Sequence, residues 1–299
     1  MYRPCVAVKG VQAKGVQMSK GALPALKGGV QKLLTRAGIY ERARSSWIYD
    51  FYWGLANKNI IDDRQSEVEF YRTLLDGLRE GHLIFDVGAN RGYKTDIFLR
   101  LGAAVVAVEP DEACQEILKQ KFLKYRFKKK RLVIVSRAVS DTSSTVAMWI
   151  DGPGSAMNTL SQKWAETLRD DDRFGQRLSF GQRREVETVS IEQLIAAHGS
   201  PFFIKIDVEG HELNVLRGMQ RPVPFLSFEV NLPDFRSEGL ECIQVLERLA
   251  RDGKFNYTAD CRRGLVLKEW ITGDEISSVL DSCKDESIEV FWKTSVREP

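Results

Sequence analysis

The 299-residue sequence lacks the features that mark several classes of protein. It has no uninterrupted apolar run of about 18 residues, which a membrane-spanning helix requires. Its start shows no apolar segment followed by a small-residue cleavage site, so we do not expect secretion. Its five cysteines are scattered and form no C-x-x-C pair, which argues against a structural zinc site or a dithiol redox centre. We therefore expect a cytoplasmic protein with reduced thiols.

The composition is that of a folded protein with one unusual end. Hydrophobic residues make up 43% and charged residues 28% of the chain, which excludes a disordered protein. The net charge of +3 hides an asymmetry, because residues 1–46 hold nine Lys or Arg and one acid, Glu41. Four leucines and a valine at helical spacing, beside lysines, predict a basic amphipathic helix over residues 23–34. Helices of this type can contact anionic membranes. Peripheral membrane contact through residues 1–46 and packing on the protein's own domain both stay open.

A second basic run spans residues 119–131 and contains three aromatic residues, Phe122, Tyr125 and Phe127. Grooves that bind single-stranded nucleic acid can have this composition. We interpret the run instead as the exposed end of a helix that leads into a strand, with the aromatic rings turned toward the core. We expect no nucleic-acid partner.

From residue 61 onward, short apolar runs alternate with helical segments, which predicts a mostly parallel sheet with helices on both faces. Strands are expected at 83–87, 104–108, 132–139, 202–208 and 225–230, and helices at 94–101, 112–122 and 212–219. Further strands are expected at 255–258, 264–268 and 287–292. The fold class is therefore α/β, a Rossmann-like doubly wound sheet over residues 61–299, after a basic and partly helical extension over residues 1–60. Residues 151–185 are too long for a simple connection and are expected to build the substrate side of a site.

The first strand runs into a sharp turn, L-I-F-D-V-G-A-N-R-G-Y, that contains Asp86, Gly88, Ala89, Asn90 and Gly92. In a doubly wound sheet this turn lies at the carboxyl ends of the strands, where ligands bind, and its glycines let a ligand approach the backbone. The turn differs from the phosphate-binding G-x-G-x-x-G motif because a carboxylate stands at its start. A carboxylate repels phosphate and suits an ammonium group. The pattern therefore favours S-adenosylmethionine over a nicotinamide dinucleotide.

Acidic residues also follow the next two strands. Glu109 ends the second strand about 20 residues beyond the first turn, where a carboxylate can accept hydrogen bonds from both ribose hydroxyls. This position supports a nucleoside cofactor without choosing between the two candidates. Asp141 follows the third strand, where it could meet the adenine amino group or merely form a turn before Thr142. The sequence leaves these two roles of Asp141 open.

The third motif, F-F-I-K-I-D-V-E-G-H-E, places three charges on one face of a strand, Lys205, Asp207 and Glu209. Charges in a central strand are costly to bury without partners or a task. We interpret them, together with His211, as a site for proton removal or substrate orientation. A simple ion pair between Lys205 and Asp207 beside a helix cap is the structural alternative. A divalent metal on Asp207, Glu209 and Glu229 is compatible with the pattern but not demanded by it.

Taken together, these motifs resemble the FkbM family of S-adenosylmethionine-dependent methyltransferases. The resemblance runs from about residue 67 to 229 and is densest at 85–95 and 203–212. Glu192 departs from the family pattern, which has Asp at this point. The resemblance implies a seven-stranded methyltransferase sheet, S-adenosylmethionine as cofactor, and methyl transfer to a hydroxyl on a sugar, glycan or natural product.

The resemblance also implies roles for the residues. The acceptor hydroxyl must lose its proton as the bond to the methyl group forms. His211 has the most suitable ordinary pKa for a base, whereas Asp207 and Glu209 serve as base or orienting groups, and Lys205 fixes Asp207. Two other functions stay as alternatives: a nicotinamide-dependent oxidoreductase, and a non-catalytic nucleoside-binding module at a membrane.

Overall fold

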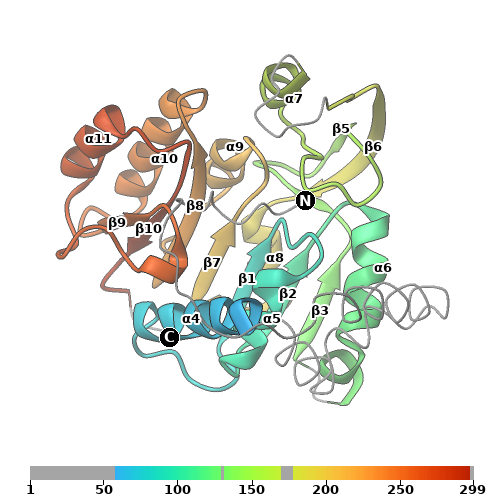
Figure 1. Cartoon of the computed structure of the whole chain (residues 1–299), viewed down its shortest axis with the longest axis horizontal. Helices are drawn as coiled ribbons and strands as arrows, with labels where there is room; N and C mark the ends of the chain where they lie inside the picture. Colours follow the sequence, from blue (N-terminus) through green and yellow to red (C-terminus); the bar gives the residue numbers. More distant parts are fainter. Residues whose placement is uncertain (1–57, 129–130, 170–177, 297–299) are drawn as a thin grey trace, which may run out of the picture.

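The computed structural model describes residues 58–128, 131–169 and 178–296 (Figure 1). The basic extension predicted over residues 1–60 lies almost wholly outside the described residues, so its membrane contact stays a prediction. Among the helices that are described, none is long and apolar enough to cross a membrane.

The core of the molecule is a seven-stranded sheet with the order β3-β2-β1-β7-β8-β10-β9. All neighbours are parallel except β10, which runs antiparallel to β8 and β9. The strand order reverses between β1 and β7, and this switch point is where a doubly wound sheet binds its ligand. The strands are β1 (Leu83–Val87), β2 (Ala104–Val108), β3 (Leu132–Val135), β7 (Phe203–Ile206), β8 (Phe225–Asn231), β9 (Lys254–Thr258) and β10 (Ser287–Lys293).

Helices cover both faces of this sheet, which explains why its central strands are apolar on both sides (Figure 1). One face packs against α4 (Lys58–Leu74), α5 (Tyr93–Arg100) and α6 (Glu112–Lys121). The other face packs against α8 (Ile191–His198), α9 (Glu212–Arg217), α10 (Arg236–Leu249) and α11 (Gly273–Ser282). The predicted α/β class and the mostly parallel sheet are confirmed.

A smaller sheet stands beside the main one, and its strands lie before and after most of the long insertion, residues 151–185. It has the order β4-β6-β5, with β4 (Ala138–Val139), β5 (Thr145–Ile150) and β6 (Gln182–Val189), and α7 (Gln162–Arg169) lies within the same excursion. The single strand expected at 132–139 was wrong, because the chain leaves the main sheet after Val135 and Ala138 then pairs with Thr188.

Two other expectations were also wrong in detail. Residues 264–268 form no strand, because the backbone of Leu267 is hydrogen-bonded to the buried side chain of Asn256. Asn256 Nδ2 donates to the Leu267 carbonyl at 2.9 Å, and Asn256 Oδ1 accepts from the Leu267 amide at 3.2 Å. In the basic run, Phe122 is buried and Tyr125 packs on the core, but Phe127 is 67% exposed. The guanidinium of Arg126 lies 5.0 Å from the centre of the Phe127 ring.

The departure at Glu192 leaves the local structure intact. Ser190 is the N-cap of α8 and forms a reciprocal capping box with Gln193. Glu192 instead accepts a hydrogen bond from the backbone amide of Gln220 at 2.9 Å, which joins the start of α8 to the end of α9.

Candidate active site

The turn after β1 is built by close backbone contacts. Gly88, Asn90 and Gly92 all have positive φ values, of 80°, 47° and 72°. A Cβ atom added to Gly88 would lie 1.8 Å from the carbonyl oxygen of Asp207, so this position requires glycine. The amides of Gly88 and Ala89 donate to the carbonyl of Val108, which ties the turn to the end of β2.

Glu109 sits directly beside this turn, as its spacing predicted. Its Oε2 accepts from the Asn90 amide at 2.7 Å and its Oε1 accepts from the Asp111 amide at 2.8 Å. Burial raises the pKa of Glu109 to about 7, although both amide hydrogen bonds act to lower it. The carboxylate is therefore held in one orientation by backbone donors.

A cleft of about 730 Å³, including its open mouth, lies over these strand ends. Gly88, Asn90 and Glu109 line it from the ends of β1 and β2, and Asp207 and Glu209 line it from the end of β7. Residues of the 155–160 segment and apolar side chains line it as well: Val108, Ala138, Val139, Met148 and Leu160 are its apolar members. This mixture of an apolar lining with a few fixed polar groups is typical of small-molecule sites.

Six predicted site residues lie outside the cleft lining: Asp86, Ala89, Gly92, Asp141, Lys205 and His211. Asp86 is 1% exposed beneath the turn, where Thr95 donates to it and Lys205 is its neighbour across the strands. Burial raises the pKa of Asp86, partly offset by the charge of Lys205. Asp141 is exposed and accepts from the hydroxyls of Ser140 and Thr142, as a turn residue does. Their direct contacts with a cofactor stay predictions.

His211 also lies outside the cleft lining. Its Nε2 lies 3.1 Å from the Ser140 hydroxyl and its Nδ1 lies 3.2 Å from the side-chain amide of Asn214. Burial lowers the pKa of His211 to about 4, so the ring is neutral at ordinary pH. The structure thus gives His211 partners away from the cleft.

The other catalytic candidates do come together. Lys205 Nζ and Asp207 Oδ2 form an ion pair of 2.7 Å, with Lys205 only 4% exposed. Asp207, Glu209 and Glu229 each offer a carboxylate oxygen, and these three atoms lie within 4.8 Å of one another. We call these three residues the carboxylate cluster. Its spacing is also compatible with a divalent cation, the alternative that the sequence left open.

The pKa values in the carboxylate cluster follow from burial, from the closeness of its three acids and from the ion pair between Lys205 and Asp207. Burial acts to raise the pKa of Asp207, but the charge and hydrogen bond of Lys205 outweigh it, and the pKa falls below its usual value. Burial and the charge of Asp207 raise the pKa of Glu209 to about 8. The same two causes raise the pKa of Glu229 well above its usual value. Glu209 and Glu229 therefore favour their protonated forms beside an Asp207 that favours its ionised form, and Glu209 exchanges its proton near pH 8.

Glu209 is also fixed by its backbone and by the excursion. It has a φ of 55°, a left-handed conformation that non-glycine residues seldom adopt and that often marks a functional site. Trp164 on α7 donates its indole N–H to Glu209 Oε2 at 3.0 Å, and the hydroxyl of Thr159 donates to the Glu209 carbonyl at 2.6 Å. Sequence reasoning missed both residues.

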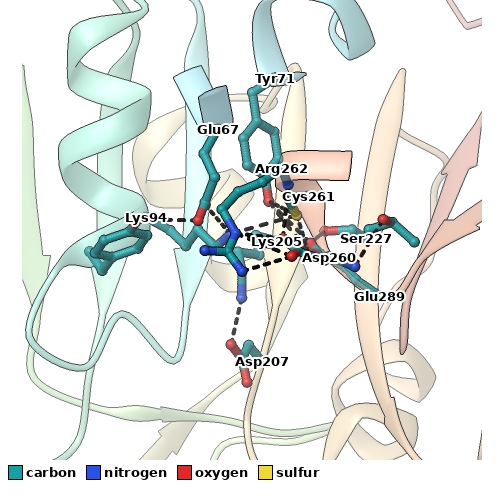
Figure 2. Close-up of polar contacts among 12 residues, drawn as sticks. Glu67, Tyr71, Lys94, Lys205, Asp207, Ser227, Asp260, Cys261, Arg262 and Glu289 are labelled. Atoms are coloured by element: carbon teal, nitrogen blue, oxygen red, sulfur yellow. Dashed lines mark hydrogen bonds and ion pairs between the residues drawn. The ribbon is translucent and has the colours of Figure 1, made fainter. Parts of the chain in front are cut away.

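A further polar network lies behind Lys205, on the face of the sheet that α4 covers (Figure 2). Glu67 on α4 pairs with Lys94 on α5 at 2.7 Å. Glu289 on β10 accepts from the hydroxyl of Ser227 at 2.7 Å and from the thiol of Cys261 at 3.3 Å. The network therefore ties α4, α5 and the C-terminal strands together around the buried end of Lys205.

The sheet order, the glycine turn and the carboxylate after β2 place the protein among the Rossmann-like methyltransferases. A family model, the methyltransferase FkbM domain, matches residues 86–255, more than half of the chain. The chain therefore belongs to the FkbM methyltransferase family, and the predicted family and cofactor, S-adenosylmethionine, are confirmed. This membership decides against the nicotinamide-dependent oxidoreductase.

Solved structures similar to this chain are also methyltransferases. Methyltransferase FkbM from Methylobacillus flagellatus KT is 15% identical with a TM-score of 0.48, over 76% of this chain and 47% of that one. A TehB-like S-adenosylmethionine-dependent methyltransferase from Corynebacterium glutamicum is 12% identical with a TM-score of 0.37, over 77% and 88%. The chain thus spans about half the length of the Methylobacillus protein. No curated protein matches the sequence.

The residues of the cleft fit this cofactor. A nucleoside needs an acceptor for its ribose hydroxyls and an apolar slot for its base, and the cleft offers Glu109 for the first and the side chains of Val108, Val139 and Met148 for the second. Asp207 and Glu209 line the same cleft, and their role at the reacting methyl group stays a prediction.

Proposed function

We propose that the protein is an O-methyltransferase that acts on a hydroxyl group of a sugar, glycan or natural-product acceptor. The observation that carries the proposal is Glu209, a carboxyl group at the end of the cofactor cleft whose pKa is raised to about 8. A hydroxyl is a poor nucleophile until its proton is taken, and a base is most effective when its pKa lies near the working pH.

Different residues bind the cofactor, accept the proton and orient the acceptor hydroxyl. The cleft, with Glu109 and the turn after β1, holds S-adenosylmethionine, which when bound supplies a methyl group activated by its positively charged sulfur. Glu209 accepts the proton of the acceptor hydroxyl, and Trp164 keeps its carboxylate aimed by the hydrogen bond of 3.0 Å. Asp207, ionised beside Lys205, orients the hydroxyl and favours positive charge nearby.

The excess of acid at this end of the cleft supports the same chemistry. Lys205 pairs with Asp207, so the carboxylate cluster gains net negative charge when Glu209 loses its proton near its pKa of about 8. In that state the site attracts a cofactor that carries a positive sulfur and holds its neutral product less strongly. We expect the acceptor itself to be neutral or weakly charged.

The experiment is a methyl-transfer screen with the full chain. The protein is incubated with radiolabelled S-adenosylmethionine and a panel of sugars, oligosaccharides and hydroxylated small molecules, together with amine and thiol analogues of the same size. We expect a methyl ether and S-adenosylhomocysteine in equal amounts. Methylation confined to the amines or thiols would contradict the proposal, and so would tight cofactor binding with no transfer to any acceptor, which favours the non-catalytic module.

A further inference from the structure

The first part of the excursion lies against the cofactor cleft. Residues 151–185 were expected to serve the acceptor, yet Ser155, Ala156 and Asn158 line the same cleft as Glu109. We call residues 151–160 the cover loop.

One buried carboxylate joins the cover loop to the body of the protein. Asp111 is 2% exposed and is the N-cap of α6, where its Oδ1 accepts from the amides of Ala113 at 2.9 Å and Cys114 at 3.1 Å. The same Oδ1 also accepts from the Gly154 amide at 3.1 Å. Its other oxygen accepts from the side-chain amide of Asn158, also at 3.1 Å. A single side chain thus begins a helix and anchors the loop at two points.

Further hydrogen bonds hold the cover loop, some within the loop and one from the turn after β1. Arg91, in the turn after β1, donates from Nη2 to the Gly154 carbonyl at 3.1 Å. The side chain of Asn158 accepts from the Asp151 amide and donates to the Gly152 carbonyl, both at 2.9 Å. These bonds hold the loop in the shape that lines the cleft.

We propose that the cover loop is a second wall of the S-adenosylmethionine site, opposite Glu109, and that Asp111 is a positioning residue that holds this wall through Gly154 and Asn158. The proposal rests on the cleft being the cofactor site. Asp111 is not among the residues that line the cleft, so its effect on the cofactor passes through the loop. The excursion then contributes to the cofactor site through the cover loop and holds Glu209 through Thr159 and Trp164.

The test measures S-adenosylhomocysteine binding by calorimetry in the full chain. Asn158→Ala removes the bond to Asp111 and both braces within the loop, and we expect about tenfold weaker binding, since each lost hydrogen bond contributes about a factor of two to ten. Asp111→Asn keeps an oxygen for the helix cap but turns N–H groups toward the donating amide of Asn158. We expect a loss of similar size from a residue that touches no ligand.

Two further measurements separate positioning from general damage. Ser190→Ala removes the N-cap of α8, away from the cleft, and should lower the melting temperature without changing affinity. Amide exchange in residues 151–160 should accelerate in both loop variants and stay unchanged in Ser190→Ala. If Asp111→Asn does not fold, Asn158→Ala still decides by the same two readouts.

The outcomes distinguish the loop from the site itself. Wild-type affinity in Asn158→Ala, or unchanged exchange in its loop, overturns the role of the cover loop while leaving the cleft in place. Glu109→Gln tests the cleft separately, and full affinity in that variant overturns the placement of the cofactor on which the proposal rests.

Discussion

The carboxylates in and around the cleft form two groups that are held in opposite ways. We call Glu109 and Asp111 the cofactor end, and the carboxylate cluster the acceptor end. At the cofactor end, Glu109 and Asp111 accept hydrogen bonds from backbone amides, and each oxygen of Glu109 has its own donor. At the acceptor end, the three carboxyl groups of the carboxylate cluster lie close together, and Lys205 forms an ion pair with Asp207. The first arrangement fixes a binding surface, and the second stores charge repulsion.

This difference separates binding from reactivity. Backbone donors do not titrate or move far, so they hold the Glu109 carboxyl group in one place, although burial raises its pKa to about 7. Crowded acids instead shift one another's pKa values, which is what proton transfer near neutral pH requires. If the comparison is right, variants at the two ends should change different quantities, affinity at one end and turnover or pH response at the other.

The largest effect is expected for Glu209→Gln. The amide keeps the size and the bond to Trp164 but cannot accept the proton, so the turnover number should fall by about 10² to 10⁴. The affinity for S-adenosylhomocysteine should change less than threefold. Steady-state methyl transfer to an acceptor from the screen measures the first, and calorimetry the second. Glu166→Gln, an exposed glutamate on α7, is the matched control, and a Glu209→Gln variant that keeps full turnover would remove the assigned base.

The two ends also differ in how much the sequence predicted. The turn from Asp86 to Gly92 and the position of Glu109 follow from local rules, because a strand, a glycine turn and a spacing of about 20 residues fix them. The alternation of Lys205 and Asp207 on one face of a strand is equally local. These features of the fold and the candidate site needed no knowledge of tertiary structure.

The groups that tune those residues were not predictable in the same way. Trp164 and Glu209 are 45 positions apart, and Asn158 and Asp111 are 47 apart. Their contacts depend on the path of the excursion, and its composition fixes no path. The same limit applies to His211, whose role stays a prediction: its chemistry suits a base, but only the packing against Ser140 sets which way the ring faces.

The next largest effect is expected for Lys205→Met, which removes the cation from the carboxylate cluster. The ionised Asp207 then loses its ion-pair partner, although its hydrogen bond with Glu229 remains, and breaking a buried ion pair lowers the free energy of unfolding by about 3–5 kcal/mol. Urea denaturation at pH 7 measures the change. Lys205→Met with Asp207→Asn should recover part of the loss, and a single variant as stable as the wild type would mean that Lys205 does not balance the cluster.

A smaller effect is expected in the pH dependence of stability. Because the folded state raises the pKa of Glu209 to about 8 and that of Glu229 well above its ordinary value, both favour the protonated form. Their contribution is complete below about pH 4.5 and is lost as pH rises through the folded pKa, by at most about 1.4 kcal/mol per pH unit for each group.

Glu229→Gln tests this dependence because it cannot ionise. The variant should therefore gain stability over the wild type as pH rises from 6 to 9, in denaturation curves recorded across that range. Glu286→Gln, at an exposed glutamate, should follow the wild-type curve. Parallel curves for Glu229→Gln and the wild type would mean that the acceptor end stores no charge repulsion, and the contrast with the cofactor end would disappear.

The smallest effect is expected for His211→Gln. The ring lies outside the cleft lining, its nitrogens face Ser140 and Asn214, and burial lowers its pKa to about 4, so between pH 6 and 9 it neither gains nor loses a proton. Glutamine can keep a hydrogen bond with Ser140. Turnover and affinity should each change less than threefold, with the pH–rate profile unmoved. A tenfold fall in turnover at constant affinity would instead return His211 to the site as the base, because no loss of packing near Ser140 would leave cofactor binding intact and stop the proton transfer alone.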